Sequence, residues 1–310
     1  MKPVLLVLIA LSRPRLAVFA GSFEVLNAPD AQSRSQALSR DGSRVRLVLT
    51  NGSIGLAADE MDQMPGLTFV CAMGAGYENV AVEHARSRGV TVVNGAGTNA
   101  SCVADHAMAL LLAMVRGLPQ LDRACRNGVW RNDLPMPHGI TGKRLGIFGL
   151  GHIGRKIASR AQAFEMEVGY CSRSVKPDVP YPRFDDLTAL AAWCDVLVLA
   201  TPGGPETLHQ VDAGVLKALG PAGYLVNIAR GSIVQTAALA QALRDGIIRA
   251  AALDVYEGEP EPPRELMAFG NILLTPHVSG WSPHAIEASL QMFMENARRH
   301  LAGEPVLTPV

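Results

Sequence analysis

The chain has 310 residues, and its 28 basic and 28 acidic residues give a formal net charge of zero. Hydrophobic residues make up 48% and charged residues 18% of the chain, a composition that excludes a disordered protein. A neutral chain has no global field that attracts a polyanion, so we expect no nucleic-acid partner and no anionic membrane surface as a partner. A small anionic ligand must therefore be held by local groups.

The five cysteines are scattered, with no CxxC pair. This spacing predicts no metal site and no disulfide framework, and it favours a reducing, cytoplasmic location. The apolar run 4–11 is too short to cross a membrane and is followed by Ser12, Arg13, Pro14 and Arg15. We therefore interpret it as a buried first strand and expect no membrane association.

Short apolar runs alternate with helix-like stretches in the first third of the chain. Strands are expected at 4–10, 23–27, 45–50, 68–72 and 90–93, and helices at 13–20, 30–40, 56–64 and 79–88. After a turn at 95–99, a long apolar helix over 101–116 is ended by Gly117 and Pro119. Strands that alternate with helices predict βαβ units and a parallel sheet.

A second series of the same kind begins at Lys143, after an irregular stretch at 127–142. Strands are expected near 144–149, 167–171, 195–200, 223–228, 249–253 and 271–274, with helices near 153–165, 186–192, 208–219 and 236–245. The last helix, 283–301, has no strand after it, so we expect it to pack back on one of the sheets. The predicted fold class is α/β, with two doubly wound parallel-sheet domains.

The first strand of the second series leads into a glycine-rich loop, Gly149-Leu150-Gly151-His152-Ile153-Gly154, and then into a helix. Gly149 permits a tight turn, Gly151 allows a pyrophosphate to approach the backbone, and Gly154 allows the helix to pack closely on the strand. The N-terminus of the helix offers N–H donors and a partial positive charge. The motif predicts a dinucleotide site.

The next strand ends at Ser172-Arg173-Ser174, where a protein that prefers NAD usually has a carboxylate for the ribose 2′-hydroxyl. A guanidinium and two hydroxyls suit a 2′-phosphate instead, because arginine forms charge-assisted bonds to phosphate. We therefore predict NADPH as the preferred cofactor, with NADH also possible.

Three further motifs follow consecutive predicted strands. They are Asn227-Ile228-Ala229-Arg230-Gly231, the segment from Asp254 to Pro260, which contains Glu259, and Thr275-Pro276-His277. Ligands of open α/β sheets bind at the carboxyl ends of the strands. A surface charge or a turn residue would account for each motif alone, but their joint position beside a dinucleotide site predicts a chemical site.

These motifs together resemble the D-isomer-specific 2-hydroxyacid dehydrogenase family, in particular its glyoxylate/hydroxypyruvate and hydroxyphenylpyruvate reductase branch. The resemblance spans essentially the whole chain and includes Gly74-Ala75-Gly76-Tyr77-Glu78-Asn79-Val80 and the segment 94–105. It implies a Rossmann cofactor domain at 98–281, inserted in a flavodoxin-like substrate domain made of 1–97 and 282–310.

The resemblance also implies roles for the motif residues. His277 would be the general acid that protonates the carbonyl oxygen of a 2-oxo acid, and Glu259 would hold the imidazole and favour its charged form. Arg230 would bind the carboxylate and carbonyl oxygens of the substrate. Asp254 would position the nicotinamide end of the cofactor or order its own loop.

Further contacts are implied for both ligands. Cofactor contacts are expected from the glycine-rich loop, Ser172 to Ser174, Thr201, Pro202, Ile228 and Asp254. Substrate contacts are expected from Asn51, Gly52, Met73, Gly74, Ala75, Arg230, His277 and Trp281, with a packing role for Trp281 left equally open. Trp130 resembles the tryptophan of a family dimerisation arm, so a homodimer is expected. Ala96 and the stretch 234–236 depart from the family pattern but do not touch the proposed chemistry.

The expected function is an NADPH-dependent reductase of small 2-oxo acids, of the glyoxylate or hydroxypyruvate type. A bulkier substrate, such as phenylpyruvate or a 2-ketoaldonate, is compatible with the same residues. A different hydride donor, such as 3-phosphoglycerate or phosphite, and a non-catalytic nucleotide-sensing protein like the corepressors that share the fold are the remaining alternatives.

Overall fold

The computed structural model describes residues 2–310. The chain divides into two compact units, Met1–Asn99 with Trp281–Val310, and Ala100–Gly280. The sequence predicted the first boundary between the domains at 97/98, two residues before the boundary in the structure, and the second at 281/282, one residue after it. Trp281 therefore falls in the first unit, although it had been counted as the last residue of the cofactor domain.

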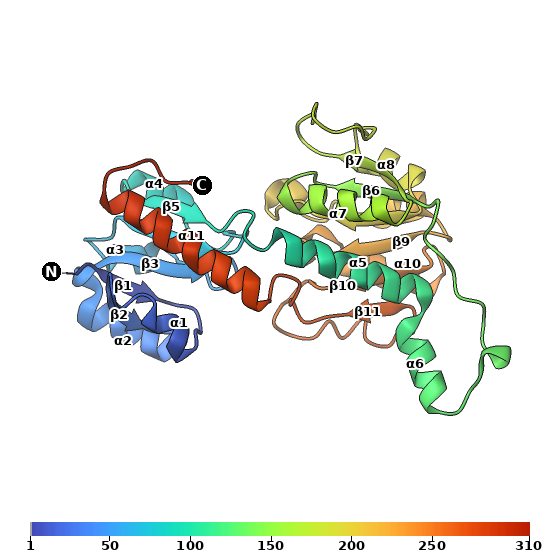
Figure 1. Cartoon of the computed structure of the whole chain (residues 1–310), viewed down its shortest axis with the longest axis horizontal. Helices are drawn as coiled ribbons and strands as arrows, with labels where there is room; N and C mark the ends of the chain where they lie inside the picture. The colour runs from blue at the N-terminus through green and yellow to red at the C-terminus, as the bar shows by residue number, and fades with distance from the viewer. Residues whose placement is uncertain (1) are drawn as a thin grey trace. The chain divides into compact units, whose positions relative to one another are not determined.

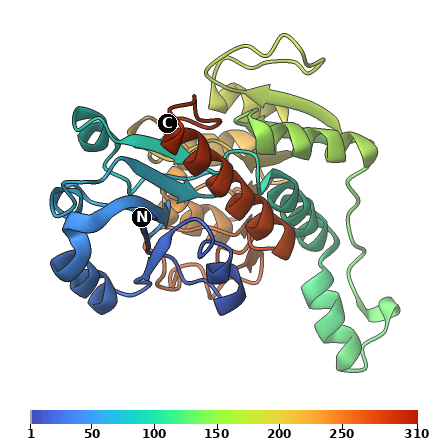
Figure 2. The ribbon, with the colours of Figure 1, turned by 60° about the vertical axis from the view of Figure 1, so that its left-hand side comes forward.

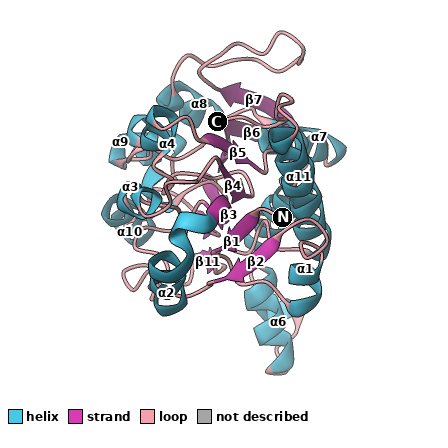
Figure 3. Cartoon of the chain, turned by 90° about the vertical axis from the view of Figure 1, so that its left-hand side faces the viewer, coloured by secondary structure: helices cyan, strands magenta, loops and turns pink. Residues whose placement is uncertain are grey.

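The first unit contains a five-stranded sheet of order β2-β1-β3-β4-β5, in which every pair of neighbours is parallel. The strands are β1 (Val4–Val7), β2 (Glu24–Asn27), β3 (Val45–Asn51), β4 (Phe69–Met73) and β5 (Thr91–Asn94). One face is covered by α2 (Ala31–Asp41), α3 (Ala58–Asp62) and α4 (Val82–Ser87), and the other by α1 (Arg13–Ala17) and α11 (Pro283–Leu301) (Figure 3). The predicted flavodoxin-like order is confirmed.

The last helix returns to the first unit, as predicted. Phe293 of α11 is fully buried and contacts Phe19, Phe23 and Phe69, with ring centroids 5.3, 5.9 and 6.3 Å away. Burial of an aromatic cluster is strongly stabilising, so it fixes the helix against the sheet. The residues after the helix add a short antiparallel bridge to β5, at Val93 and Pro309, which the sequence did not predict.

The second unit contains a six-stranded parallel sheet of order β11-β10-β9-β8-β6-β7. The strands are β6 (Arg144–Phe148), β7 (Glu167–Cys171), β8 (Val196–Leu199), β9 (Tyr224–Asn227), β10 (Ala250–Leu253) and β11 (Ile272–Leu274). One face is covered by α5 (Ala100–Arg116) and α7 (His152–Ala163), and the other by α8 (Leu187–Trp193), α9 (Ala213–Leu219) and α10 (Thr236–Arg244) (Figure 1). Short 3₁₀ turns lie at 42–44, 131–133, 205–207 and 231–233.

One helix was missed by the sequence analysis. Gly117 does end α5, with a left-handed φ of 64°, but the chain then starts α6 (Leu118–Arg126). Pro119 had been taken as a stop, whereas proline near the start of a helix is favourable because its missing N–H group has no partner there anyway. None of the α6 residues is buried, and the helix extends away from the sheet of its own unit (Figure 2). The prediction for α9 began too early, since 208–212 is irregular.

The parallel topology places the carboxyl ends of all strands of a sheet at one edge. The order of the strands reverses at β6 and β8 in the second unit and at β1 and β3 in the first, and ligands of such sheets bind at these reversals. No single helix within residues 2–310 is long and apolar enough to cross a membrane; only the bent pair α5 and α6 meets that criterion, by length and composition. Several residues of α5 are buried in the core of the second unit.

Candidate active site

Two of the predicted site residues form a hydrogen-bonded pair at the edge of the second sheet. His277 Nδ1 lies 2.6 Å from Glu259 Oε2, and about a third of each side chain is exposed. The other carboxylate oxygen, Glu259 Oε1, accepts a hydrogen bond of 2.8 Å from the backbone N–H of Tyr256. Glu259 is therefore fixed by its own loop, and it in turn orients the imidazole so that Nε2 is the nitrogen left for a ligand.

Asp254 organises the loop that carries His277. Its side chain is completely buried. Oδ1 accepts bonds from the Thr275 hydroxyl at 2.6 Å and from the Val278 N–H at 2.9 Å, and Oδ2 accepts the Ser279 N–H at 2.8 Å. Asp254 was predicted either to position the nicotinamide end of the cofactor or to order its own loop, and these contacts support the second role.

The environment of Asp254 keeps it ionised. Burial alone opposes the charged form, but hydrogen bonds from Thr275, Val278 and Ser279 outweigh burial and hold the pKa of Asp254 below its ordinary value of 3.8. The Asp254 carboxylate is therefore negatively charged at neutral pH although it is buried. Both of its oxygens accept hydrogen bonds from the residues that follow β11.

Arg230 follows β9 and is presented by a tightly packed turn. The Asn227 side chain is fully buried; its Nδ2 donates to Arg230 O at 2.9 Å and its Oδ1 accepts the Ala229 N–H at 3.0 Å. A Cβ on Gly231 would lie 2.0 Å from the carbonyl carbon of Tyr256. Only glycine fits there, and the Arg230 turn thus packs directly on the loop that carries Glu259.

A second histidine–carboxylate pair anchors the same loop from its other side. His209 Nε2 lies 2.6 Å from Glu257 Oε1, and Glu257 Oε2 accepts the backbone N–H of Thr236 at the start of α10, at 2.9 Å. Burial opposes the charge on Glu257, but the bonds from Thr236 and His209 lower its pKa below the ordinary value. The sequence analysis missed His209, because nothing in the local pattern shows that 209 and 257 meet.

The glycine-rich loop has the geometry that its sequence predicts. Gly149 adopts a φ of 101°, and a Cβ there would lie 2.7 Å from Ala200 and Thr201 backbone atoms, while a Cβ on Gly154 would lie 2.2 Å from Gly149 O. Gly151, at the start of α7, has no other atom within 4 Å of the equivalent position. Backbone atoms thus fill the space beside Gly149 and Gly154, whereas the space beside Gly151 is free for a dinucleotide pyrophosphate.

The remaining predicted cofactor residues lie along the same edge. Thr201 and Pro202 follow β8, and Ile228 follows β9 with only 4% of its surface exposed. Leu150 is also buried, at 1% exposed, so it and Ile228 offer backbone groups rather than side chains. The structure therefore brings together, within one unit, the strand ends that carry the glycine loop, Thr201, Arg230, Asp254 and His277.

The segment after β7 presents a cluster of cationic and hydroxyl groups. Ser172 Oγ donates to Ser174 O at 2.7 Å, and Lys176 Nζ donates to Ser174 Oγ at 2.8 Å. Arg173 Nη1 lies 3.3 Å from Glu206 Oε2, with both side chains more than three-quarters exposed. Lys176 was missed by the sequence analysis, although its position two residues after Ser174 was the available signal.

Two contacts hold this segment in place. The N–H of Lys176 donates to the Tyr170 hydroxyl at 2.9 Å, and Arg155 of α7 forms a two-bond pair with Asp178, at 2.6 and 2.9 Å. The Arg155 partner holds the pKa of Asp178 below its ordinary value. The segment that carries Ser172 to Lys176 is therefore anchored to α7 through Arg155 and Asp178, and to β7 through the Tyr170 hydroxyl.

In the first unit, the predicted substrate residues meet at the carboxyl ends of β3 and β4. Asn51 Oδ1 accepts the Ile54 N–H at 2.7 Å, and Asn94 Nδ2 donates to Ala75 O at 2.9 Å. A Cβ on Gly52 would lie 2.7 Å from the Gly76 carbonyl carbon, so the 51–55 and 73–76 loops pack on each other. Trp281 is 73% exposed at the start of the returning segment, and both roles predicted for it stay predictions.

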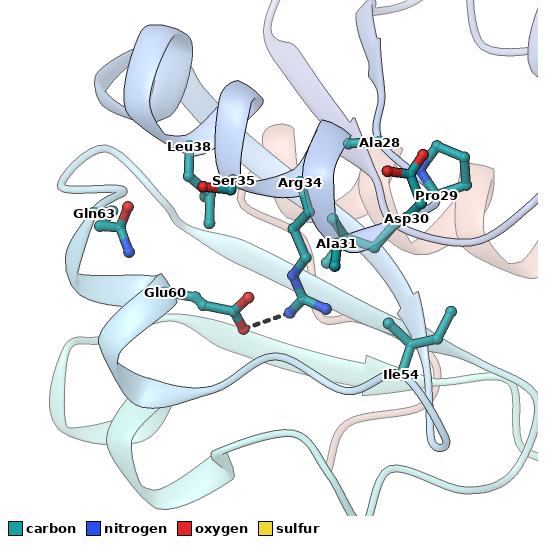
Figure 4. Close-up of a pocket in the computed structure, with 11 residues that line it drawn as sticks. Ala28, Pro29, Asp30, Ala31, Arg34, Ser35, Leu38, Ile54, Glu60 and Gln63 are labelled. Carbon is teal, nitrogen blue, oxygen red and sulfur yellow. Dashed lines mark hydrogen bonds and ion pairs between the residues drawn. The ribbon is translucent and has the colours of Figure 1, made fainter. Parts of the chain in front are cut away.

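A separate cavity of about 490 Å³ lies between α2, α3 and the ends of β1 and β2 (Figure 4). Arg34 lines it and pairs with Glu60, and Asp30 lies on the same cavity. None of the predicted site residues lines it, and its carboxylates leave no excess positive charge for an anionic substrate. The described residues contain no group of three or more His, Cys, Asp or Glu side chains that could hold a metal ion.

Comparison with known proteins gives a consistent result. Residues 108–279 match the family model described as "D-isomer specific 2-hydroxyacid dehydrogenase, NAD binding domain". The chain is 37% identical to hydroxyphenylpyruvate reductase of Plectranthus scutellarioides over 88% of each chain. It is 36% identical to glyoxylate/hydroxypyruvate reductase A of Arabidopsis thaliana, over 93% of this chain and 92% of that one.

A solved structure is similar over the full length. The NADPH-dependent glyoxylate/hydroxypyruvate reductase of Sinorhizobium meliloti, in complex with NADP and malonate, has a TM-score of 0.91 and 34% identity, and the match covers 100% of this chain and 97% of that one.

The role of Asp254 in holding the His277 loop is testable by substitution. Asp254→Asn replaces a carboxylate oxygen with an amide N–H that would face a backbone donor, so it should lower the free energy of unfolding by about 1–3 kcal/mol at pH 7. The folded-state pKa of Asp254 is lowered, so its stabilising contribution is present above about pH 4 and is lost as the pH falls through that lowered pKa. Denaturant unfolding of both proteins between pH 7 and pH 3 measures the difference, which should shrink on acidification.

Asp178→Asn is the matched control, because Asp178 is an exposed carboxylate that also has a lowered pKa. It should destabilise far less, since exposed ion pairs contribute little. Equal effects of the two substitutions at pH 7 would contradict the role assigned to Asp254.

Proposed function

The chain belongs to the D-isomer specific 2-hydroxyacid dehydrogenase family, and from that premise we propose that it is an NADPH-dependent reductase of small 2-oxo acids, with glyoxylate and hydroxypyruvate as the first candidate substrates. The protein is an NAD(P)-dependent oxidoreductase of 2-oxo and 2-hydroxy acids. The observation that carries the mechanism is the His277–Glu259 pair, 2.6 Å long, on the same sheet edge as Arg230 and the glycine-rich loop.

Reduction of a 2-oxo acid needs a hydride at the carbonyl carbon and a proton at the carbonyl oxygen. The nicotinamide ring, when bound, supplies the hydride. His277 supplies the proton from Nε2, because Glu259 engages Nδ1 and orients the ring. After transfer, His277 is neutral and keeps its Nδ1 proton, and in the oxidation direction it accepts the proton back.

Arg230 complements this proton transfer. Its planar guanidinium can bind a carboxylate oxygen and the carbonyl oxygen together, where negative charge accumulates as the hydride arrives. The buried Asn227 side chain and the close Gly231–Tyr256 contact hold the Arg230 backbone, which favours a fixed position for the substrate. The predicted substrate contacts in the first unit, from Asn51, Gly52, Met73, Gly74, Ala75 and Trp281, are part of the proposal.

The proposed preference for NADPH rests on the segment after β7. No carboxylate stands at Ser172-Arg173-Ser174, and Lys176 adds a second cation at the Ser174 hydroxyl, 2.8 Å away. Bonds from guanidinium, ammonium and hydroxyl groups favour a 2′-phosphate over a 2′-hydroxyl.

A homodimer is also part of the proposal. It is supported by four large apolar side chains that are exposed on α6 and on the segment after it, namely Leu118, Val129, Trp130 and Met136. Exposed apolar groups of this kind are typical of a surface that is covered in an assembly.

A bulkier 2-oxo acid is the second candidate substrate. It is favoured by the similarity to a hydroxyphenylpyruvate reductase, 37% identical over 88% of the chain. The same His277, Glu259 and Arg230 chemistry would serve either substrate, because it acts only on the 2-oxo acid group.

Steady-state turnover of the purified protein tests the proposal. Consumption of NADPH, followed by its absorbance, should give the highest kcat/KM with glyoxylate or hydroxypyruvate within a panel that also holds phenylpyruvate, 4-hydroxyphenylpyruvate and 2-ketogluconate. The hydroxypyruvate product should have the D configuration. A higher kcat/KM for an aromatic acid moves the assignment to the second candidate, and no turnover with any member refutes both.

Substitution of the proposed acid tests the mechanism. His277→Ala should lower kcat by roughly 10²–10⁴ with the best substrate, because a positioned proton donor contributes about that much. His138→Ala is the control, since His138 is exposed and its Nε2 lies 3.1 Å from Arg249 Nη1, away from the proposed chemistry. A kcat for His277→Ala within a factor of about two of the unsubstituted protein would show that the acid is another group.

Selectivity between the two cofactors tests the 2′-phosphate site. Arg173→Ala should lower kcat/KM for NADPH by about tenfold, near the lower limit for a charged hydrogen bond because the site is exposed, and leave kcat/KM for NADH nearly unchanged. Arg183→Ala is the control, because Arg183 pairs with Asp185 on the same segment at 2.9 Å. If the ratio of the two kcat/KM values is the same in all three proteins, Arg173 does not recognise the phosphate.

A further inference from the structure

His106 is a polar residue on the apolar helix α5 that the mechanism above does not use. Its Nε2 lies 3.1 Å from Thr275 Oγ1 and 3.5 Å from Asp254 Oδ1. The helix packs against β9, β10 and β11, and His106 faces the ends of the last two strands. The histidine therefore contacts, from α5, the same Thr275 and Asp254 groups that hold the His277 loop.

The direction of each hydrogen bond follows from the groups involved. The Thr275 hydroxyl has one proton, and Asp254 Oδ1, an ionised carboxylate oxygen at 2.6 Å, can only accept it. The threonine oxygen must then accept from His106, which fixes the proton of the imidazole on Nε2. The result is a chain of donors that runs from His106 through Thr275 to Asp254.

Asp254 defines the backbone around His277 through its carbonyl oxygen and its carboxylate. The N–H groups of His277, Val278 and Ser279 donate to Asp254 O, Oδ1 and Oδ2 at 2.8, 2.9 and 2.8 Å. His277 itself has a left-handed φ of 54°, a conformation that a residue other than glycine adopts only when its surroundings impose it. Fixed oxygens on Asp254 therefore hold the strained residue that presents the imidazole.

We propose that His106 is a positioning residue for the reaction: it donates through Thr275 to Asp254 and thereby fixes the loop that presents His277. This inference rests on the proposed role of His277 as the proton donor. In a chain of this kind each bond polarises the next one, so a donor at its start strengthens the bond from the Thr275 hydroxyl to Asp254 Oδ1. That bond fixes the position of the carboxylate that accepts the backbone N–H groups of Val278 and Ser279.

A packing role alone does not account for His106. The apolar residues of α5, including Val103, Ala107 and Leu110, already bury the helix in the core of its unit. The neighbouring Asp105 is exposed and bonds Arg160 of α7 instead, at 2.6 Å. The His106 side chain is 23% exposed. Its ring contacts the Thr275 hydroxyl and the Asp254 carboxylate.

Two substitutions at His106 separate hydrogen bonding from packing. His106→Leu places an apolar side chain of similar size there and removes the donor, whereas His106→Gln places an amide N–H near the position of Nε2. His106→Leu should lower kcat by about 3-fold to 10-fold, the size of one net hydrogen bond, and leave KM for the 2-oxo acid and for NADPH nearly unchanged. His106→Gln should recover at least half of the lost kcat.

Hydrogen–deuterium exchange of the 275–280 segment gives a second readout that does not depend on activity. Exchange should be faster in His106→Leu than in the unsubstituted protein and should be slowed again in His106→Gln. Leu112→Ala is the control, because Leu112 packs on the core from the same helix and has no hydrogen-bonding side chain. It should lower the melting temperature without changing kcat or the exchange of this segment.

The inference is overturned if exchange of the 275–280 segment is unchanged in His106→Leu, if kcat is unchanged, or if His106→Gln behaves as His106→Leu does. Failure of the proposed function gives a different result, namely no turnover of any 2-oxo acid by the unsubstituted protein. In that case the exchange of the His106 and Leu112 variants still decides whether His106 orders the loop.

Discussion

The buried carboxylate of Asp254 is the constraint on which the rest of the site depends. It terminates β10, accepts donors from the end of β11, and remains ionised because those donors outweigh its desolvation. Through it, two neighbouring parallel strands end in a common network instead of in two independent loops. His277 can occupy a left-handed conformation because the N–H groups on and after it are fixed by this one residue.

A second constraint is the loop between Tyr256 and Glu259, which is held from three directions. Glu259 binds His277, Glu257 binds His209 and the start of α10, and Gly231 packs on Tyr256. The side chains of Glu257 and Glu259, two residues apart, therefore bind different histidines, His209 and His277. Glu259 is preorganised by its own backbone bond before any ligand binds, which is the condition under which a carboxylate can orient a histidine effectively.

The sequence predicted the eleven strands that the structure describes within residues 2–310, because short apolar runs bounded by turn residues are typical of the buried strands of a parallel sheet. The site residues followed from that, since Arg230, Asp254 and His277 come directly after strands whose ends must share an edge. Contacts between side chains of distant elements were not predictable, because the residues next to His106 and His209 in the sequence do not indicate that these histidines meet Asp254 and Glu257. The α6 helix was missed for a local reason, because glycine and proline mark both the end of one helix and the start of another.

The neutral charge of the chain is consistent with how its cations are used. Arg173 lies 3.3 Å from Glu206, but both side chains are more than three-quarters exposed, and an exposed pair contributes very little. At the proposed 2′-phosphate site, exchange of the Glu206 carboxylate for a phosphate therefore costs little free energy. Arg155, in contrast, is held by two short bonds to Asp178 and anchors the segment. Under the proposed preference for NADPH, a protein without excess positive charge recognises the 2′-phosphate through a weakly held arginine, Arg173, while a firmly held one, Arg155, fixes the chain around it.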